Sequence, residues 1–317
     1  MSLFAKLSGL KENISLSQHT TFRIGGPAKY FLVVRDEADF KKAVRVAREA
    51  KMPFYVLGGG SNMLVADQGF AGLVIKIQNV KIKSQNFKAK DKIIEVEAGF
   101  LFNKLIIDSV RENYAGIEWG FGIPGTIGGA ICGNAGRLGE DISGVVRAVR
   151  VLDKNLTEKE LTAPQCAFGY RESRFKKTGE IILGATLRLR KKEPTAIAEK
   201  FNAAKAVILH SPRFPSAGCA FKNYQTTGPQ DPLLKNHPEL EQRVRGGKIG
   251  VGFLIDQAGM KGQKVGGAQV WDGHANYIIN TGGATAADVR LLMRNVTEAV
   301  GSKYGLALEP EVRFLGF

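Results

Sequence analysis

The sequence predicts an α+β protein built from more than one domain. Helical and strand-like patterns alternate over the first 190 residues, and helical patterns dominate from about residue 195. The chain has 317 residues, which is more than one hydrophobic core usually fills. Glycine supplies 38 of them, well above its usual ~7% share, and clusters in three short stretches. Such clusters indicate loops shaped around something rather than flexible linkers.

Apolar spacing predicts the elements of the first 190 residues. Residues 36–51 place Phe40, Val44 and Ala47 on one helical stripe, and residues 101–113 repeat this pattern. Strand-like apolar content, often alternating, marks 53–57, 71–77, 92–99, 145–153 and 180–190.

Three helices and one strand are predicted in the C-terminal part. The helices cover 195–210, 250–259 and 285–305, and the strand covers 274–280. Thr285 and Asp288 resemble a capping pair at the start of the last helix, and Gly305 ends it. The change of pattern places a domain boundary between residues 195 and 210.

The net charge of +15 at pH 7 fits several classes of partner, namely nucleic acid, a membrane surface or a small anionic ligand. Composition does not choose among them. The lysines of residues 80–92 are expected on the solvated face of a hairpin, and no aromatic-plus-basic signature of a nucleic-acid site accompanies them.

Cysteine spacing argues against both zinc and disulfides. Cys132, Cys166 and Cys219 form no CxxC or CxxH pair, so we expect no metal site and no disulfide framework. The first 13 residues are interrupted by Lys6 and Lys11 and therefore cannot supply the apolar segment of a signal peptide. The longest uncharged run, 119–136, contains too much glycine for a membrane helix, so the cytoplasm is the expected location.

Two glycine-rich stretches are candidate anion-binding loops. The chain has no GxxxxGK[ST] motif, and GGGSN (58–62) matches a dinucleotide fingerprint only weakly. Consecutive glycines can aim successive backbone N–H groups at one anion, yet a tight turn between two strands explains GGGSN equally well. The stretch 122–136 favours the ligand, because Pro124 sets a turn and Gly125 lets backbone approach closely. Two such stretches fit a diphosphate-bridged dinucleotide held from two sides.

Seven motifs then occur in a fixed order along nearly the whole chain, and together they are highly specific. They are LGGGSNMLVAD (57–67), GIPGTIGGAICGNAG (122–136), FGYRESRF (168–175), PSAGCAFKN (215–223), GGAQV (266–270), HANYIIN (274–280) and LEPEVRF (308–314). This set closely resembles the UDP-N-acetylenolpyruvoylglucosamine reductase family of bacterial peptidoglycan synthesis.

The resemblance implies a fold and a reaction. The fold is a two-part FAD-binding domain of the PCMH/vanillyl-alcohol-oxidase type, followed by a C-terminal α+β substrate-binding domain. The implied parts are 1–79 and 80–194 for FAD, 195–305 for the substrate, and 306–317 as a strand returning to the active site. NADPH would reduce the flavin and leave. The enolpyruvyl ether of a UDP-sugar would then receive hydride at C3 and a proton at C2, giving UDP-N-acetylmuramate.

The resemblance also implies binding residues. Those implied to hold FAD are Gly58, Gly59, Gly60, Ser61, Asn62, Pro124, Gly125, Thr126, Gly128, Gly129, Asn134 and Ala135. Those implied to surround the UDP-sugar are Tyr170, Lys222, Asn223 and His274, although a solvated lysine or a satisfied core histidine would explain Lys222 or His274 as well. No nucleic acid, membrane or obligate protein partner is expected.

Three residues are implied to act in catalysis, namely Arg171, Cys219 and Glu311. Hydride addition at C3 pushes negative charge onto C2 and its carboxylate, which a guanidinium can bind with two parallel hydrogen bonds. Glu311 helps most when protonated or bridged to a cation, because two bare carboxylates repel each other. Cys219 stands where the family commonly has a serine that protonates C2. A thiol with an ordinary pKa of ~8.5 is a better acid than an alcohol, so cysteine can supply this proton.

Two other cysteines and one segment complete the predictions. Cys132 is expected to pack near the cofactor and Cys166 in the core. Residues 224–247 are longer than expected for the short form of the family, and their composition predicts an exposed loop that acts as a lid or a partner contact. Two alternative functions stay open: an FAD-dependent oxidase that reduces oxygen, and a basic, non-enzymatic nucleic-acid or nucleotide binder.

Overall fold

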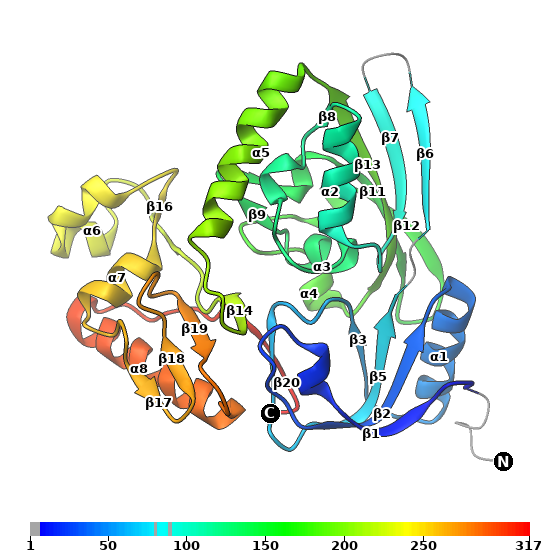
Figure 1. Ribbon diagram of the computed structural model, residues 1–317, viewed down its shortest axis with the longest axis horizontal. Coiled ribbons are helices and arrows are strands. Elements are labelled where there is room, and N and C mark those ends of the chain that lie inside the picture. The colour runs from blue at the N-terminus through cyan, green and yellow to red at the C-terminus, as the bar shows by residue number, and fades with distance from the viewer. Residues whose placement is uncertain (1–6, 79–80, 88–90) are drawn as a thin grey trace. The chain divides into compact units, whose positions relative to one another are not determined.

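The computed structural model describes residues 7–78, 81–87 and 91–317, and the chain forms two compact units (Figure 1). The first unit contains the residues up to Ile14, Ala28–Gly59 and Ala71–Leu209. The second unit contains Ser15–Pro27, Gly60–Phe70 and His210–Phe317. Two short N-terminal segments therefore belong with the C-terminal part of the chain. The predicted division into four parts is finer than these two units and stays a prediction.

A four-stranded sheet and one helix form the N-terminal part of the first unit. Helix α1 (Glu37–Glu49) buries Phe40, Val44 and Ala47 in one cluster with Leu73 of the sheet, as the predicted stripe requires. The Asp36 carboxylate caps the helix by accepting a hydrogen bond from the Asp39 N–H at 2.8 Å. The sheet has the order β1-β2-β5-β3, with bounds β1 (Lys11–Ser15), β2 (Pro27–Val34), β3 (Phe54–Leu57) and β5 (Phe70–Ile77).

The second sheet of this unit is antiparallel and carries helices on one side. Its order is β12-β11-β13-β7-β6, with a short β8 also paired to β13. The strands are β6 (Ile82–Phe87), β7 (Asp91–Glu97), β8 (Tyr114–Ala115), β11 (Val146–Leu152), β12 (Glu158–Thr162) and β13 (Ile181–Lys191). Around them lie α2 (Phe102–Arg111), α3 (Ile127–Cys132), α4 (Phe175–Thr178), the pair β9 (Gly136–Arg137) and β10 (Glu140–Asp141), and 3-10 turns at 118–120, 142–144 and 164–166; a further 3-10 turn at 16–19 belongs to the second unit. The predicted strands and the second predicted helix are thereby confirmed.

The hairpin predicted for residues 80–92 exists as β6 and β7. The prediction that its lysines are solvated is wrong for Lys92. This side chain is only 8% exposed, pairs with Glu112, and lies 5.2 Å above the ring of Tyr114. Strand alternation explains the burial, because Lys92 shares one face of β7 with the buried Ile94. Residues 80 and 88–90 of the predicted hairpin lie outside the described part of the chain.

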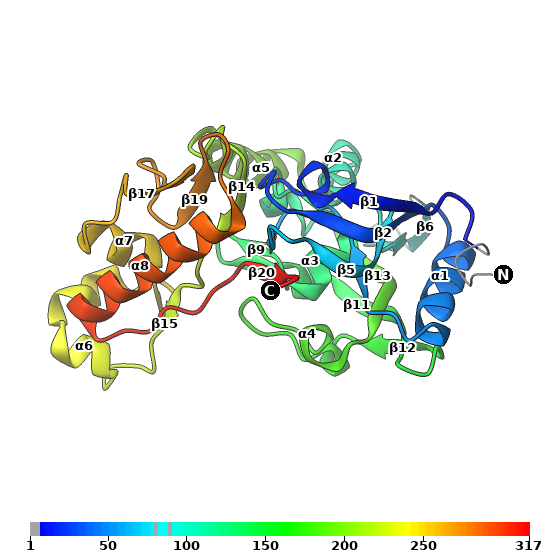
Figure 2. The same ribbon diagram turned by 90° about the horizontal axis from the view of Figure 1, so that it is seen from below.

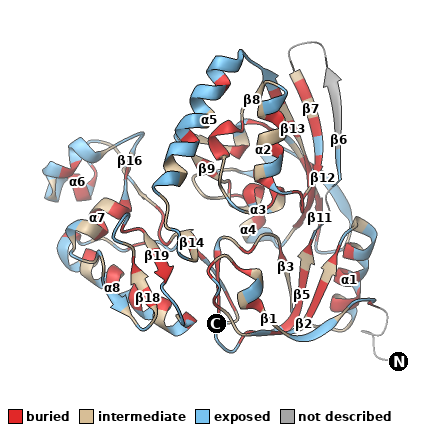
Figure 3. Ribbon diagram, viewed as in Figure 1, coloured by how far each residue is buried: buried red, intermediate tan, exposed pale blue. Residues whose placement is uncertain are grey.

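The predicted helix near residue 195 is α5 (Pro194–Leu209), and it packs on the first unit. The ring of Phe201 lies 4.3 Å from that of Phe121, and a Cβ on Gly122 would lie 2.1 Å from Ile208. Most of α5 is nevertheless exposed, as Figure 3 shows, and only Ile197 and Ala204 are buried.

A smaller sheet and its helices form the core of the second unit. Helix α8 (Ala286–Tyr304) packs against the sheet strands β17 and β18 (Figures 1 and 2) and begins with the predicted capping box of Thr285 and Asp288. No helix among the described residues is both long and apolar enough to cross a membrane. The sheet order is β14-β19-β18-β17, with bounds β14 (Ser216–Cys219), β17 (Lys264–Val265), β18 (Ala268–Val270) and β19 (Tyr277–Asn280). The remaining elements are α7 (Val251–Gln257), the parallel pair β4 (Met63–Val65) and β20 (Arg313–Leu315), and the pair β15 (Tyr224–Gln225) and β16 (Lys248–Ile249).

Most residues of 224–247 are exposed as predicted, but the segment is not a simple loop, because it contains helical turns and supplies four buried residues to the core. Its role as a lid or a partner contact stays a prediction. The segment contains α6 (Pro232–Asn236) and a 3-10 helix at 238–243, and its three leucines at 233, 234 and 240 are buried. Asp231 is fully buried and organises the segment. Its carboxylate accepts hydrogen bonds from the Tyr224 hydroxyl at 2.9 Å, the Thr227 N–H at 2.8 Å and the Leu233 N–H at 2.9 Å.

Replacing Asp231 by asparagine is expected to lower the free energy of unfolding by about 3 kcal/mol at neutral pH. The Nδ2 group of asparagine is a donor, and it would replace a carboxylate oxygen that accepts hydrogen bonds from N–H and O–H groups. Burial alone raises the pKa of Asp231, but these hydrogen bonds outweigh it and lower the pKa overall. The carboxylate therefore stabilises the fold above its unfolded pKa of ~3.9, and this contribution is lost as the pH falls through the lowered folded value.

Urea unfolding of both proteins over a pH series measures the difference, which should shrink as the solution becomes acidic. Glu241→Gln is the matched control, because Glu241 lies in the same segment and is exposed. Equal stability of the wild type and Asp231→Asn at pH 7 would contradict the prediction.

Candidate active site

The two glycine-rich stretches meet in the first unit. A Cβ atom on Gly59 would lie 2.6 Å from the Cα of Gly125, and one on Gly58 would lie 2.6 Å from the Oγ1 of Thr126. Side chains do not tolerate such distances, so the two backbones pass in direct contact and present peptide groups there. Gly125 also has a φ of +121°, which favours glycine. Such a surface suits a flat or charged ligand that lies along the backbone.

The other predicted residues of the second stretch divide between packing and surface. Gly128 is a packing residue, because its N–H donates to the Ala98 carbonyl at 2.8 Å and a Cβ there would lie 2.9 Å from the Ala98 side chain. Pro124 and Gly129 are exposed, and a Cβ on Gly129 would meet nothing nearer than 3.7 Å. Of this group, Pro124 and Gly129 have the exposure that a ligand contact requires.

Asn134 and Ala135 use their polar groups within the protein. Asn134 is 2% exposed, its Nδ2 donates to the Gly169 carbonyl at 2.8 Å, and its Oδ1 accepts from the Ser143 N–H at 3.3 Å. The Ala135 N–H and carbonyl bond to the backbone of Ala130 and Ile142 at 2.8 and 2.9 Å. This geometry indicates that Asn134 holds the turn at residue 169, a role that the sequence did not suggest.

Arg171 lies at the tip of that turn in a strained conformation. The backbones of Gly169 and Glu172 exchange two hydrogen bonds of 3.0 Å, which leaves Tyr170 and Arg171 as the central residues. Arg171 has a φ of +56°, a left-handed value that glycine adopts at far lower cost. Its Nη2 donates to the Gly136 carbonyl at 2.8 Å, so the guanidinium is oriented by the second glycine-rich stretch. Other non-glycine residues, such as Arg23 and Leu156, have similar φ values, so the catalytic role of Arg171 stays a prediction.

The second unit brings Cys219 and Glu311 together. Cys219 ends β14, and the carbonyl of the next residue, Ala220, accepts a hydrogen bond from the Glu311 N–H at 2.9 Å. Both side chains are partly exposed. Two members of the predicted trio are thus neighbours, and Arg171 is part of the first unit.

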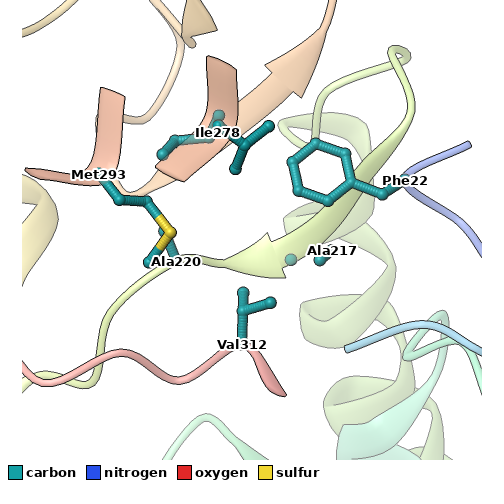
Figure 4. A pocket seen from close by; sticks show the side chains of 8 residues that line it. Phe22, Ala217, Ala220, Ile278, Met293 and Val312 are labelled. Atoms are coloured by element: carbon teal, nitrogen blue, oxygen red, sulfur yellow. The ribbon is translucent and has the colours of Figure 1, made fainter. Parts of the chain in front are cut away.

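A small apolar cavity lies next to the backbone segments that contain Cys219 and Glu311. Figure 4 shows Ala217, Ala220 and Val312 facing it, together with Phe22, Ile278 and Met293. Ala220 and Val312 directly follow Cys219 and Glu311 in the sequence and belong to the apolar core of the second unit, so both segments pack on that core.

The end of GGGSN belongs to the second unit and contacts the segment of Glu311. The Asn62 Nδ2 donates to the Glu311 carbonyl at 3.2 Å, and the Asn62 carbonyl accepts from the Arg313 N–H at 3.2 Å. A Cβ on Gly60 would lie 2.1 Å from the His19 carbonyl oxygen, so only glycine fits there. Ser61 is half-buried and Asn62 is exposed.

The four residues predicted to surround the substrate lie in different settings. Tyr170 is half-buried, with the Arg171 guanidinium 5.4 Å from its ring centre. Lys222 is buried and pairs with the exposed Glu309, and the Asn223 Oδ1 accepts from the Val251 N–H at 3.1 Å at the start of α7. Asn223 therefore has a local structural role.

His274 is exposed on one side, and its other side lies on Gly252. Burial of that side lowers the pKa of the imidazole below its ordinary value. The Nδ1 atom lies 3.2 Å from the Asn276 N–H and accepts its hydrogen bond, which leaves Nε2 to carry the proton of the neutral ring.

Two structural residues near the site escaped sequence reasoning. Asn276 is 2% exposed and clamps Phe221, accepting from its N–H at 3.0 Å and donating to its carbonyl at 2.8 Å. Ser173 is also buried and donates to the Cys132 carbonyl at 2.7 Å. Both lie in motifs that the sequence analysis names, HAN and YRES. In those motifs the predicted site residues are His274 and Arg171, and no local pattern marks Asn276 or Ser173 as buried.

The other two cysteines lie in the first unit. Cys166 is buried in the core as predicted, and burial raises the pKa of its thiol to about 11. Cys132 packs partly buried against the same core, and its proximity to a cofactor stays a prediction.

Comparisons with known proteins agree on one family over almost the whole chain. The family described as "UDP-N-acetylenolpyruvoylglucosamine reductase, C-terminal domain" matches residues 210–315, and a family described as "FAD binding domain" matches residues 28–160. Curated reductases of that name from Carboxydothermus hydrogenoformans and Gloeobacter violaceus are 37% and 34% identical, covering 98% and 97% of this chain and 95% and 96% of theirs.

A solved structure of a reductase from the same family also matches the chain. The crystal structure of UDP-N-acetylenolpyruvylglucosamine reductase from Thermus caldophilus has a TM-score of 0.76 and 30% identity, and the match covers 96% of this chain and 99% of that one.

Proposed function

Because the chain belongs to the UDP-N-acetylenolpyruvoylglucosamine reductase family, we propose that it reduces UDP-N-acetylglucosamine enolpyruvate to UDP-N-acetylmuramate. The reaction uses NADPH and FAD and supplies a peptidoglycan precursor. The observation that carries the proposal is that whole relatives, rather than one domain of them, match this chain. The matches cover 96% and 95% of the two curated relatives and 99% of the solved one.

The backbone contact between the two glycine-rich stretches fits FAD. Gly58, Gly59 and Gly125 leave no room for side chains, so peptide groups are available to a diphosphate and to a flat ring. When bound there, FAD would supply the transfer of hydride from NADPH to the substrate. We assign Gly58–Asn62, Pro124, Gly125 and Gly129 to the cofactor. We reassign Thr126, Gly128, Asn134 and Ala135 to the support of these loops, Thr126 because it is 4% exposed and its Oγ1 accepts from the Gly129 N–H at 3.4 Å.

Cys219 is the proposed proton donor. Its Sγ–H protonates C2 while hydride arrives at C3, so the double bond of the enolpyruvyl group becomes saturated and the thiolate later recovers its proton from solvent. Glu311 acts in the same step, since its backbone is bonded to the residue after Cys219. Arg171 binds the substrate carboxylate and stabilises the negative charge that spreads onto it.

The substrate contacts that we retain are Tyr170, Lys222 and His274. We assign to Asn223 the task of holding α7 against the segment that contains Lys222, because its amide oxygen accepts from Val251. NADPH and UDP-sugars are cytoplasmic metabolites, so the proposal places the enzyme in the cytoplasm and requires no nucleic acid, membrane or second protein.

The visible spectrum tests the proposal. The purified protein is expected to be yellow, with flavin absorption near the ~450 nm typical of the cofactor. NADPH should bleach this band without air, and the enolpyruvyl substrate should restore it with formation of UDP-N-acetylmuramate. A colourless protein, or a bleached protein that oxygen reoxidises and the substrate does not, would contradict the proposed function.

A further inference from the structure

Thr21 joins two segments of the second unit that the proposed function uses separately. Its N–H donates to the Gly60 carbonyl at 3.0 Å, and its Oγ1 donates to the Ser216 carbonyl at 2.7 Å. Gly60 belongs to the loop assigned to FAD, and Ser216 begins the strand that ends at Cys219. One residue thus connects the cofactor loop to the strand of the proton donor.

The position of Cys219 depends on such a connection. Strand β14 pairs with β19 at Ser216 and at Cys219, but the register shifts between these two pairs. Gly218 lies in the shift with a φ of +82°, and a Cβ on it would meet nothing within 4 Å. The interrupted ladder and the glycine at positive φ make the strand irregular between its two pairs with β19. By contrast, the backbone at and after Cys219 is held by β19 and by the hydrogen bond from the Glu311 N–H to the Ala220 carbonyl. The hydrogen bond from Thr21 holds the strand at its first residue, before the irregular part.

Thr21 is itself held in a rigid setting. The next residue, Phe22, is 2% exposed in the core, and its carbonyl accepts from the Asn280 Nδ2 at 3.2 Å. The Asn280 N–H donates to the Pro215 carbonyl at 2.9 Å, beside Ser216. The Thr21 hydroxyl therefore projects from a fixed backbone, as a positioning residue requires.

We infer that Thr21 is a positioning residue for proton delivery, which sets the distance between the Cys219 thiol and the bound substrate. The inference rests on the proposed function and deepens it. Proton transfer needs the donor within ~3 Å of the acceptor, and a displacement of ~1 Å in such a site can cost ~10²-fold in rate. Loss of the Thr21 hydroxyl should therefore slow the second half-reaction and spare the first.

The test compares Thr21→Val, which keeps the shape but removes the hydroxyl, with Thr21→Ser, which keeps the hydroxyl. Each is reduced with NADPH in a stopped-flow instrument and then mixed with the enolpyruvyl substrate. We expect Thr21→Val to keep its flavin, to be reduced at the wild-type rate and to be reoxidised about 10-fold more slowly or worse. Thr21→Ser should be reoxidised within about 3-fold of the wild-type rate.

Two further measurements separate positioning from general damage. The solvent deuterium isotope effect on reoxidation should increase in Thr21→Val, because proton delivery then contributes more to the barrier of the step in which hydride and proton are transferred. The double variant Thr21→Val/Cys219→Ala should be no slower than Cys219→Ala alone, because a residue that acts through the thiol has no effect in its absence.

Wild-type reoxidation in Thr21→Val, an unchanged isotope effect, or additive losses in the double variant would overturn the inference. If the valine variant loses its flavin, the smaller Thr21→Ala gives the same comparison against Thr21→Ser. A wild-type protein that the substrate does not reoxidise would instead refute the proposed function, so the two failures are distinguishable.

Discussion

Replacing Cys219 by alanine is expected to leave reduction by NADPH unchanged and to slow reoxidation by the enolpyruvyl substrate by about 10²-fold or more. The methyl side chain cannot donate a proton, and the remaining route from water lacks a positioned acid. The flavin half-reaction with NADPH has no use for this thiol. Anaerobic stopped-flow spectroscopy at ~450 nm measures both half-reactions on one sample.

The matched control is Cys219→Ser, which restores a hydroxyl donor of nearly the same size. Its reoxidation should lie well above that of the alanine variant. At alkaline pH the wild-type rate should fall as the thiol loses its proton, whereas the serine variant should keep its rate, because an alcohol does not ionise there. If the alanine variant were reoxidised as fast as the wild type, Cys219 would not be the proton donor.

Removing the Arg171 side chain is expected to slow reoxidation by about 10² to 10³-fold, as the loss of a charge-stabilising donor usually does. Arg171→Gly is the better variant, because a φ of +56° favours glycine and strains alanine. The glycine variant should therefore fold at least as well as the wild type, so a loss of activity would not reflect a damaged turn. Stopped-flow reoxidation and thermal unfolding on the same preparation check both statements.

Two controls accompany the Arg171 experiment. Lys177→Ala removes another positive charge from an exposed position in the same segment and should leave both half-reactions unchanged. Arg171→Lys keeps the charge but cannot make two parallel hydrogen bonds to a carboxylate, so its rate should be intermediate. If Lys177→Ala lost as much activity as Arg171→Gly, overall charge rather than the guanidinium would explain the effect.

Local patterns predicted the regular elements well. Helix α8 begins at its predicted capping box and ends at Gly305, and α1 buries its predicted stripe, because such signals act within a few residues. The failures came from distant contacts. The polar composition of 224–247 resembles a loop, yet Asp231 gathers its donors into a compact element. The lysine at position 92 looks solvated, yet its ion partner Glu112 comes from the end of α2.

The candidate site shows the same difference between what local patterns predict and what distant contacts decide. Motif order alone predicted which glycines, which arginine and which cysteine form the site, because each motif of the family is a short stretch of chain. Motif order could not distinguish a residue that contacts the ligand from one that holds a loop in place. Asn134 holds a loop in place, because its Nδ2 donates a hydrogen bond to the Gly169 carbonyl.

By itself, the sequence determined the chemistry that this protein can perform: a thiol, a guanidinium and a carboxylate in motifs of one reductase family, with glycine loops suited to FAD. Only the tertiary structure decided which backbones meet, that Cys219 and Glu311 are joined through Ala220, and that Thr21 holds the cysteine strand to the cofactor loop. The physical reason is that a side chain's type is local information, whereas a hydrogen bond between residues about two hundred positions apart exists only after the chain has folded.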